Sequence, residues 1–219
     1  MPSEIQLLFM IIDVHTHNSL SNCYLSIYNL KFEEASDKIA SSENVLFSIG
    51  IHPWFANEFT EQLFNQMEKW VEDSKIVAIG ECGLDKNSKA TFNEQVTVFE
   101  KQIQISEKIH KPLIIHCVGY FNELFELKKS LQPQQLWIIH GFRGKPQLAS
   151  QVLKAGCALS FGEYFNNESV LLTPINKLFV ETDESNLSID EIYRRIAAIK
   201  NISIDSLSAN DLFFSKNKS

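Results

Sequence analysis

Ile11-Ile12-Asp13-Val14-His15-Thr16-His17 is a short apolar run that ends in two histidines. Other apolar runs along the chain end in the same way, with a residue that can bind a metal ion at or just beyond the last position. The residues at these ends are His15, His17, Glu81, His116, His140 and Asp183. A barrel of parallel strands brings all its strand carboxyl ends to one rim, where such residues converge from distant parts of the sequence.

Short β-like runs alternate with amphipathic helical stretches along the whole chain. The strand-like runs are residues 11–14, 24–28, 45–49, 76–79, 113–115, 137–139, 158–161 and 178–180. The helical stretches are residues 32–42, 60–73, 91–110, 121–131, 146–155 and 187–200. Eight strands, most of them separated by helices, predict an α/β fold of the (β/α)8 TIM barrel type.

The length of the chain allows one such barrel. TIM barrels typically need about 250 residues, with a lower limit near 200, and this chain has 219. No repeat or Pro/Gly/Ser-rich linker interrupts it, and 44% hydrophobic and 21% charged residues are typical of a globular core. We therefore expect residues 1–219 to form a single domain with short loops, whose polar tail, residues 215–219, frays.

Neither a signal segment nor a disulfide framework is predicted. The apolar residues 7–14 lack a preceding Lys or Arg, since the first is Lys31, and Asp13 interrupts them. The cysteines are widely spaced, which favours free thiols in a reducing cytoplasm; they are Cys23, Cys82, Cys117 and Cys157. Cys82 and Cys117 each follow a proposed metal ligand, and strand alternation turns them to the opposite face.

The residues at the strand ends form a ligand set for two divalent ions. The spacing of His15 and His17 places both imidazoles on one face of a strand end. Four histidines and two carboxylates exceed what one four-coordinate ion with a bound water needs. The simplest division gives His15, His17 and Asp183 to one ion and His116 and His140 to the other, with Glu81 bridging both. Imidazole and carboxylate ligands suit Zn²⁺ and Mn²⁺ and can accept Mg²⁺, so the metal stays open among these.

Such a pair of ions suits hydrolysis of a phosphodiester. Two ions about 4 Å apart hold a hydroxide between them and clamp the oxygens of a phosphoryl group during in-line displacement. Glu81, as the bridging ligand, and Asp183, as the general base, are the predicted catalytic residues. A helix cap also explains an aspartate at position 183, but it does not explain the strand-end position.

Six segments, taken in order, resemble the successive motifs of the TatD family of metal-dependent hydrolases. They are Ile12-Asp13-Val14-His15-Thr16-His17, Gly50-Ile51-His52-Pro53-Trp54, Gly80-Glu81-Cys82-Gly83-Leu84-Asp85, Ile115-His116-Cys117, His140-Gly141-Phe142-Arg143-Gly144 and Glu181-Thr182-Asp183. The resemblance implies a TIM barrel of the amidohydrolase superfamily, a divalent metal cluster and phosphodiester hydrolysis, commonly as a deoxyribonuclease. It assigns the ligand role to the same six residues.

The chain departs from this family pattern at positions that bear on the substrate. Val118 stands where the family usually has an arginine, and Gly141 to Gly144 replace a Cys-Phe-Ser/Thr-Gly continuation. Only 36 residues follow Asp183, without the family's usual proline and Arg-Asn-Glu-Pro-like stretch. We expect Arg143 to supply a phosphate contact in place of the missing arginine, because a guanidinium suits bidentate phosphate binding. An exposed surface cation is the alternative for Arg143.

Three further polar residues lie near the predicted rim. His52 follows the third run, where it either binds substrate or orients the loop at residues 53–54. Asp85 either braces the loop after Glu81 or supports a ligating histidine by a hydrogen bond. Glu181 shares the strand parity of Asp183, and as a buried carboxylate it needs a partner that the sequence does not identify.

Charge and aromatic residues limit the possible partners. A net charge of −7 argues against a broad nucleic-acid surface, although an enzyme that grips one or two nucleotides with metal ions needs none. Trp54, Phe55 and Phe142 either stack on a base or close the barrel mouth. We expect DNA ends or a small phosphodiester as substrate, no membrane and no obligate protein partner. The alternatives are hydrolysis of a small amide, lactone or ester by the same metal site, and a non-catalytic metal-binding barrel.

Overall fold

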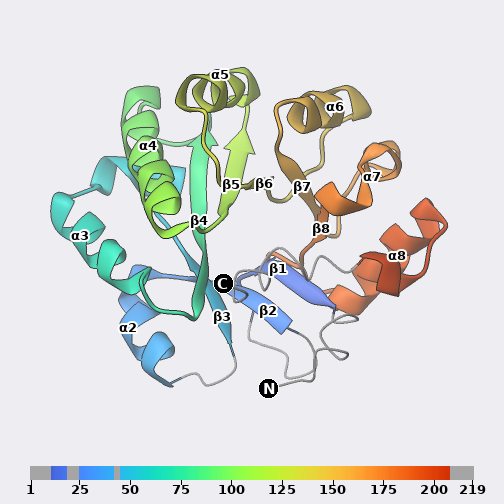
Figure 1. Cartoon of the computed structure of the whole chain (residues 1–219), viewed down its shortest axis with the longest axis horizontal. Coiled ribbons are helices and arrows are strands. Elements are labelled where there is room, and N and C mark those ends of the chain that lie inside the picture. The colour runs from blue at the N-terminus through green and yellow to red at the C-terminus, as the bar shows by residue number, and fades with distance from the viewer. Residues whose placement is uncertain (1–10, 19–24, 42–44, 208–219) are drawn as a thin grey trace.

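The computed structural model describes residues 11–18, 25–41 and 45–207, which form a ring of eight parallel strands with helices outside it (Figure 1). The strands are β1 (Ile12–Thr16), β2 (Leu25–Leu30), β3 (Leu46–Ile49), β4 (Ile76–Asp85), β5 (Leu113–Val118), β6 (Trp137–Ile139), β7 (Ala158–Phe161) and β8 (Leu178–Val180). They follow one another in the sheet in sequence order, each parallel to the next. The predicted TIM barrel is confirmed.

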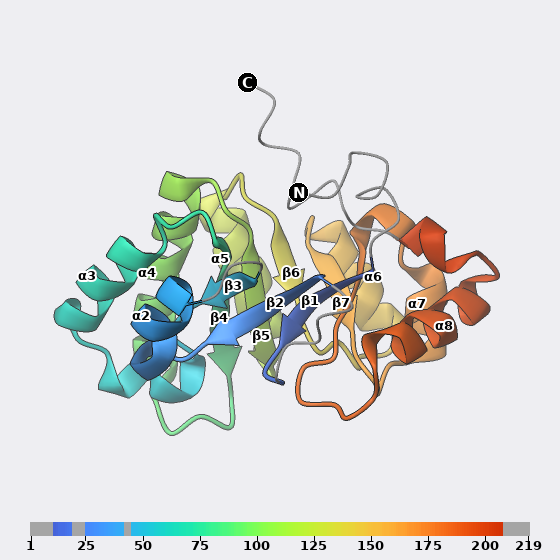
Figure 2. The same ribbon diagram turned by 90° about the horizontal axis from the view of Figure 1, so that it is seen from below.

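The helices lie around the strands, with α2, α3 and α4 on one flank and α6, α7 and α8 on the other (Figure 2). The α-helices are α2 (Phe32–Ser41), α3 (Glu61–Trp70), α4 (Phe92–Ile109), α5 (Phe121–Leu131), α6 (Pro146–Lys154), α7 (Asn167–Leu172) and α8 (Ile189–Lys200). Short 3-10 helices are η1 (Pro53–Glu58), η2 (Ile175–Lys177) and η3 (Ile204–Leu207). Among the described residues, none of the helices combines the length and apolar character needed to cross a bilayer.

The ring closes between the first and the last strand at their carboxyl ends. Thr16 and Asp183 form a parallel β-bridge. The amide of Asp183 donates to the carbonyl of His15 over 2.9 Å, and the amide of His17 donates to the carbonyl of Asp183 over 3.0 Å. The buried Asp13 carboxylate accepts from the amide (3.0 Å) and the hydroxyl (2.6 Å) of Thr182. The barrel therefore closes through β1 and the residues after β8, which carry the predicted ligands His15, His17 and Asp183.

Strand alternation separates two apolar layers. In β5, Leu113 and Ile115 belong to the large core cluster that also holds residues of the helices, whereas Ile114 belongs to a smaller cluster with Ile138 and Phe179. Successive strand side chains point to opposite faces, so His116 has the orientation of Ile114. The barrel interior is thus apolar at one level and polar at the carboxyl ends of its strands.

Strand β4 differs from the prediction. It was expected to end at Ile79 before a loop, but it continues to Asp85, and its register against β5 shifts between Ile79 and Cys82. Such an irregularity changes the alternation of a strand, so Cys82 joins the helix-facing cluster while Glu81 lies on the interior side. Gly83 has φ +131°, and a Cβ there would overlap the carbonyl oxygen of His116, which explains the glycine.

Smaller differences concern element ends. Strand β5 continues to Val118, so His116 lies inside the strand and not after it. Helix α7 was not predicted, because six residues give too short a pattern for helical periodicity. The predicted elements and features at residues 7–10, Cys23, Tyr24, Ser42 and 215–219 lie outside the described residues.

Candidate metal centre

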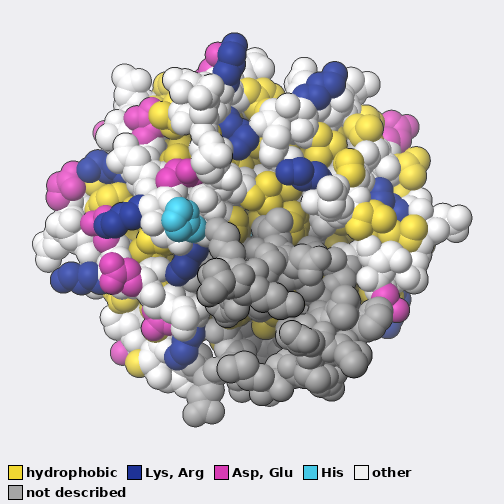
Figure 3. Space-filling model, viewed as in Figure 1, with side chains coloured by type: hydrophobic (Ala, Val, Ile, Leu, Met, Phe, Trp, Pro, Cys, Tyr) yellow, Lys and Arg dark blue, Asp and Glu magenta, His cyan; other side chains and the backbone are white. Residues whose placement is uncertain are grey.

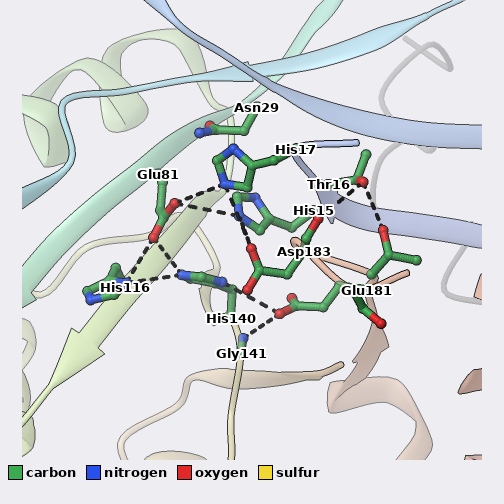
Figure 4. A network of polar contacts seen from close by, with 12 residues as sticks. His15, Thr16, His17, Asn29, Glu81, His116, His140, Gly141, Glu181 and Asp183 are labelled. Carbon is green, nitrogen blue, oxygen red and sulfur yellow. Dashed lines mark hydrogen bonds and ion pairs between the residues drawn. The ribbon is translucent and has the colours of Figure 1, made fainter. Parts of the chain in front are cut away.

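The six predicted ligands meet at the carboxyl ends of the strands, around the carboxylate of Glu81 (Figure 4). Its Oε2 atom is 3.6 Å from Nε2 of His15 and 3.4 Å from Nε2 of His17. Its Oε1 atom is 2.9 Å from Nδ1 of His116 and 2.8 Å from Nε2 of His140. One carboxylate therefore faces one pair of imidazoles with each of its oxygens. These six residues are called the candidate metal centre below.

Asp183 completes the side of the centre that β1 forms. Its Oδ1 atom is 3.8 Å from Nε2 of both His15 and His17. Its backbone has φ +54°, in the left-handed region that aspartate tolerates better than most residues. The side chain is 28% exposed, in contrast to the buried His15, so it borders the open side of the centre.

His52 reaches the centre from the loop after β3. Its Nε2 atom is 3.2 Å from Oε1 of Glu81, and its Nδ1 atom accepts from the amide of Trp54 over 3.1 Å. This second bond makes His52 the N-cap of η1. The side chain thus orients the loop, one of the two expected roles, and also adds a third imidazole beside Oε1 of Glu81.

Two acidic residues outside the six predicted ligands lie beside the histidine rings, and Asp85 has one of its two expected roles, the support of a ligating histidine. The fully buried Glu181 accepts from the amide of Gly141 over 2.5 Å and lies 3.5 Å from Nδ1 of His140. The Asp85 Oδ2 atom is 3.0 Å from Nε2 of His116. A proton on that Nε2 leaves Nδ1 of His116 to face Glu81 or a metal. The parity of Glu181 with Asp183 was the available sequence signal, and only the fold supplies its partner.

The ionisation of the centre follows from burial and from close opposite charges. Burial opposes the charged form of Glu81, but His140, His116 and His15 outweigh it, and the pKa of this carboxyl lies well below its ordinary value. Burial disfavours the charged form of His140 as well, yet Glu81 and Glu181 hold its pKa well above the usual value. The pKa of Glu181 is lowered, since His140 outweighs the effect of burial. Acidic and basic groups here stabilise each other's charges.

Unsatisfied polar atoms support a metal at this position. His15 is fully buried, and neither of its ring nitrogens has a hydrogen-bond partner; Glu181 Oε2 is also buried and without one. Buried polar atoms are nearly always paired, so these need another partner. Four sets of three donor atoms lie within 4.8 Å of one another: His15, His17 and Asp183; His15, Glu81 and His140; His52, Glu81 and His116; His140, Glu181 and Asp183. The residues fit a divalent-metal centre.

The remaining predicted residues lie around the centre in different environments. Cys82 and Cys117 lie in the helix-facing core, away from the ligands, as expected. Arg143 is exposed, and its guanidinium carbon is 5.2 Å from the ring centroid of Tyr164. Phe142 is only 3% exposed and packs against Phe121 and Phe161, so the structure assigns it to the core and not to base stacking.

Comparisons with known proteins agree with this geometry. The TatD-related DNase family profile matches residues 14–210. An uncharacterised metal-dependent hydrolase of Buchnera aphidicola is 32% identical over 176 residues, which cover 76% of this chain and 62% of that protein. The 3'-5' RNA nuclease TATDN2 of Homo sapiens is 30% identical over 159 residues, covering 67% of this chain and 21% of that protein. The chain therefore spans less than two thirds of the length of either relative.

The fold has a close counterpart among solved structures. The crystal structure of YjjV, a TatD homologue from Escherichia coli K12, superposes with a TM-score of 0.77 over 93% of this chain and 95% of that chain, at 18% identity. At this identity the likeness concerns the fold alone, whereas the family profile covers most of the sequence. The chain belongs to the family of TatD-related DNases.

Proposed function

We propose that this protein is a divalent-metal-dependent phosphodiesterase that acts on nucleic acid or on a small phosphodiester. The observation that carries the proposal is the position of Glu81. Its two carboxylate oxygens face separate groups of histidines, at 3.4–3.6 Å on the Oε2 side and 2.8–3.2 Å on the Oε1 side. A carboxylate in that position can bridge two ions, and paired ions suit phosphoryl substrates.

The donor groups support two ions. His15, His17 and Asp183 would hold one ion with Oε2 of Glu81. His116 and His140 would hold the other with Oε1 of Glu81, with His52 beside them. Bound divalent ions supply Lewis-acid polarisation of a phosphoryl oxygen and lower the pKa of a bound water. Zn²⁺, Mn²⁺ and Mg²⁺ are all compatible with these imidazole and carboxylate donors.

The protein's own groups orient and move protons around this centre. Asp183 is partly exposed and faces the His15–His17 side, so it can accept a proton from an attacking water. Asp85 lies 3.0 Å from the distal nitrogen of His116 and Glu181 lies 3.5 Å from the distal nitrogen of His140, so these carboxylates can orient the two rings. Fixed ring orientations keep the donor nitrogens aimed at one point and reduce reorganisation during the reaction.

The charge distribution supports a short contact with nucleic acid. The face in Figure 3 lies at the amino ends of the strands, opposite the candidate metal centre (Figure 2), and on it basic side chains of the described residues are scattered among acidic ones. The net charge of the chain is −7. Proteins hold long phosphate backbones mainly with Lys and Arg side chains. Because this chain is acidic, we infer that it contacts only one or two nucleotides near the end of a nucleic-acid strand. The family is described as DNase and the human relative is named an RNA nuclease, so both DNA and RNA are candidate substrates.

The proposed cellular setting is the reducing cytoplasm. Cys82, Cys117 and Cys157 are free and buried among the described residues. Free thiols are typical of reducing compartments.

The decisive experiment is a metal-dependent activity screen. Purified protein is incubated with Mg²⁺, Mn²⁺ or Zn²⁺ and with single-stranded DNA, RNA, an aryl phosphodiester and an aryl carboxylic ester. We expect cleavage of the phosphodiesters that Glu81→Gln reduces at least about 100-fold, because the bridging charge is lost. The matched control is Glu126→Gln, which changes an exposed carboxylate on α5.

Each alternative gives a different result in this screen. Turnover of the ester alone would move the assignment to carbonyl substrates. Metal binding by calorimetry without any turnover would identify a non-catalytic metal-binding barrel. Phosphodiester cleavage that Glu81→Gln leaves intact would refute the proposed centre.

A further inference from the structure

An exposed aromatic surface borders the candidate metal centre. Trp54 and Phe55 are adjacent residues on η1, and each is 54% exposed. Large aromatic side chains are generally buried, and Phe142, on the loop after β6, is only 3% exposed. Trp54 and Phe55 together are called the aromatic platform below.

The platform is separated from the centre by a single side chain. The imidazole of His52 lies 5.1 Å from the Trp54 ring and 6.2 Å from the Phe55 ring, measured between centroids. The same imidazole is 3.2 Å from Oε1 of Glu81. A group resting on the platform is therefore next to whatever binds at Glu81.

The platform is held in a fixed orientation. The indole Nε1 of Trp54 donates to Asp85 Oδ2 over 2.6 Å, and Asp85 is only 2% exposed. The Ser88 hydroxyl donates to the carbonyl of Pro53 over 2.9 Å, which fastens the start of η1 to the loop after β4. The indole is thus bound by its edge while much of its surface stays accessible. A preorganised ring loses little conformational entropy when a ligand stacks on it.

We infer that the aromatic platform is a nucleobase subsite that stacks on an unpaired base of the nucleotide whose phosphate lies at the metal centre. This inference rests on the proposed function and narrows its substrate to single strands and frayed ends. Every base has a π-face, so stacking supplies affinity without sequence preference. Stacking also contributes affinity for nucleic acid that the Lys and Arg residues of an acidic chain, with net charge −7, supply only weakly. A base within a duplex is already stacked and paired, so it does not reach the platform.

The test compares strands with and without bases. One substrate is a single-stranded oligothymidine, and the other is the same phosphodiester backbone with abasic residues. For the wild type we expect a KM about tenfold lower for oligothymidine than for the abasic strand, the size of effect that removal of one base stack produces. Trp54→Leu should remove this difference, and Trp54→Phe should retain most of it because a ring face remains. The control is Leu131→Ala, an exposed apolar residue on α5.

Failure of the inference and failure of the proposed function can be told apart. If the wild type cleaves both strands equally, or if Trp54→Leu raises KM for both strands by the same factor, the platform does not bind bases although the enzyme is a phosphodiesterase. If the wild type cleaves neither strand, the proposed function fails. Fluorescence anisotropy of labelled strands then tests the platform by itself: preference for oligothymidine that Trp54→Leu removes supports it, and equal binding refutes it.

Discussion

Asp85 illustrates how one residue can support two parts of the site. Its carboxylate is almost fully buried and accepts from Nε1 of Trp54, while lying 3.0 Å from Nε2 of His116. Burial alone would raise its pKa, but the amide of Asn87, Trp54 and His116 outweigh burial, and the pKa is lowered. Asp85 therefore stays ionised at neutral pH and fixes one imidazole of the centre together with the aromatic platform.

Asp85→Asn should weaken activity without unfolding the protein. The Asp85 carboxylate contacts Trp54 and His116 through Oδ2 and accepts from the amide of Asn87 through Oδ1. An amide has only one acceptor oxygen for these two positions and carries no charge, so the ring of His116 loses its charged partner. Loss of such a supporting group typically costs about 10- to 100-fold in activity or metal affinity. We expect a fall in kcat/KM of that size and a rise in the Mn²⁺ concentration for half-maximal activity. Asp37→Asn, on the exposed part of α2, is the control; equal effects of the two changes would contradict this role.

Arg143 is predicted to contact a substrate phosphate. It follows His140 by three residues, is exposed, and has no acidic partner among the described ion pairs. Arg143→Ala should raise KM for a phosphodiester several-fold with little change in kcat, because a contact made equally in the ground and transition states affects KM. Arg143→Lys should restore only part of the loss, since a lysine lacks the bidentate geometry. Steady-state kinetics that give an unchanged KM for Arg143→Ala would refute the contact.

At the scale of elements, the junction of β1 and β8 controls both closure and the site. Asp13 in β1 binds both the amide and the hydroxyl of Thr182, and that hydroxyl lies 2.8 Å from the hydroxyl of Thr16. Burial raises the pKa of Asp13 to about 7, against the opposing effect of the Thr182 bonds. Thr182 precedes Asp183, so the junction that closes the barrel also sets the position of a predicted ligand.

Thr182→Val should destabilise this junction. Valine has nearly the same shape but cannot donate to the Asp13 carboxylate, which leaves a buried acceptor without one of its partners. Such a loss typically costs about 1–3 kcal/mol in the free energy of unfolding, measured here by urea denaturation. Thr97→Val removes an exposed hydroxyl on α4 and serves as the control. Equal urea midpoints for the two variants would show that the Asp13–Thr182 bond does not stabilise the barrel.

The bounds of the strands show where sequence periodicity predicts the structure correctly and where it does not. Runs at residues 137–139, 158–161 and 178–180 were predicted with the bounds that the structure has, because they are short, apolar and buried on both faces. β4 was predicted too short, because Gly80 and Gly83 are turn residues in most contexts. Here both glycines allow close passage beside β5: a Cβ at Gly80 would lie 2.8 Å from the Cβ of Ile114.

At the scale of the whole molecule, the helix-facing core holds thiols that resist ionisation. Burial raises the pKa of Cys117 from 9.0 to about 12 and that of Cys157 from 9.0 to about 11. The unfolded chain releases these protons near pH 9, whereas the folded chain retains them. The contribution of both thiols to stability is therefore fully present below pH 9 and is lost as the pH rises through the range between the unfolded and the folded values.

Stability should accordingly fall at alkaline pH, and each thiol should account for a measurable part. Between pH 7 and pH 10 we expect each thiol to lower the free energy of unfolding by about 1 kcal/mol. The free energy of unfolding of Cys157→Ala should therefore fall by about 1 kcal/mol less than that of the wild type between these two pH values. Urea denaturation at both pH values measures this difference. Comparing the two proteins removes the effect of other groups that titrate in this range. Parallel losses in wild type and variant would contradict the assignment.

The sequence alone determined the order of strands and helices, the family, and the residues that gather at one rim. These follow from local patterns: the alternation of side chains along a strand, helical periodicity, and the rule that parallel strands end on the same side. Only the tertiary structure decided which way Glu81 points, since its orientation depends on the register of β4 against β5. It also decided that His52 and Glu181 lie against the candidate metal centre while Phe142 lies in the core. These outcomes depend on contacts between distant strands, which no local pattern encodes.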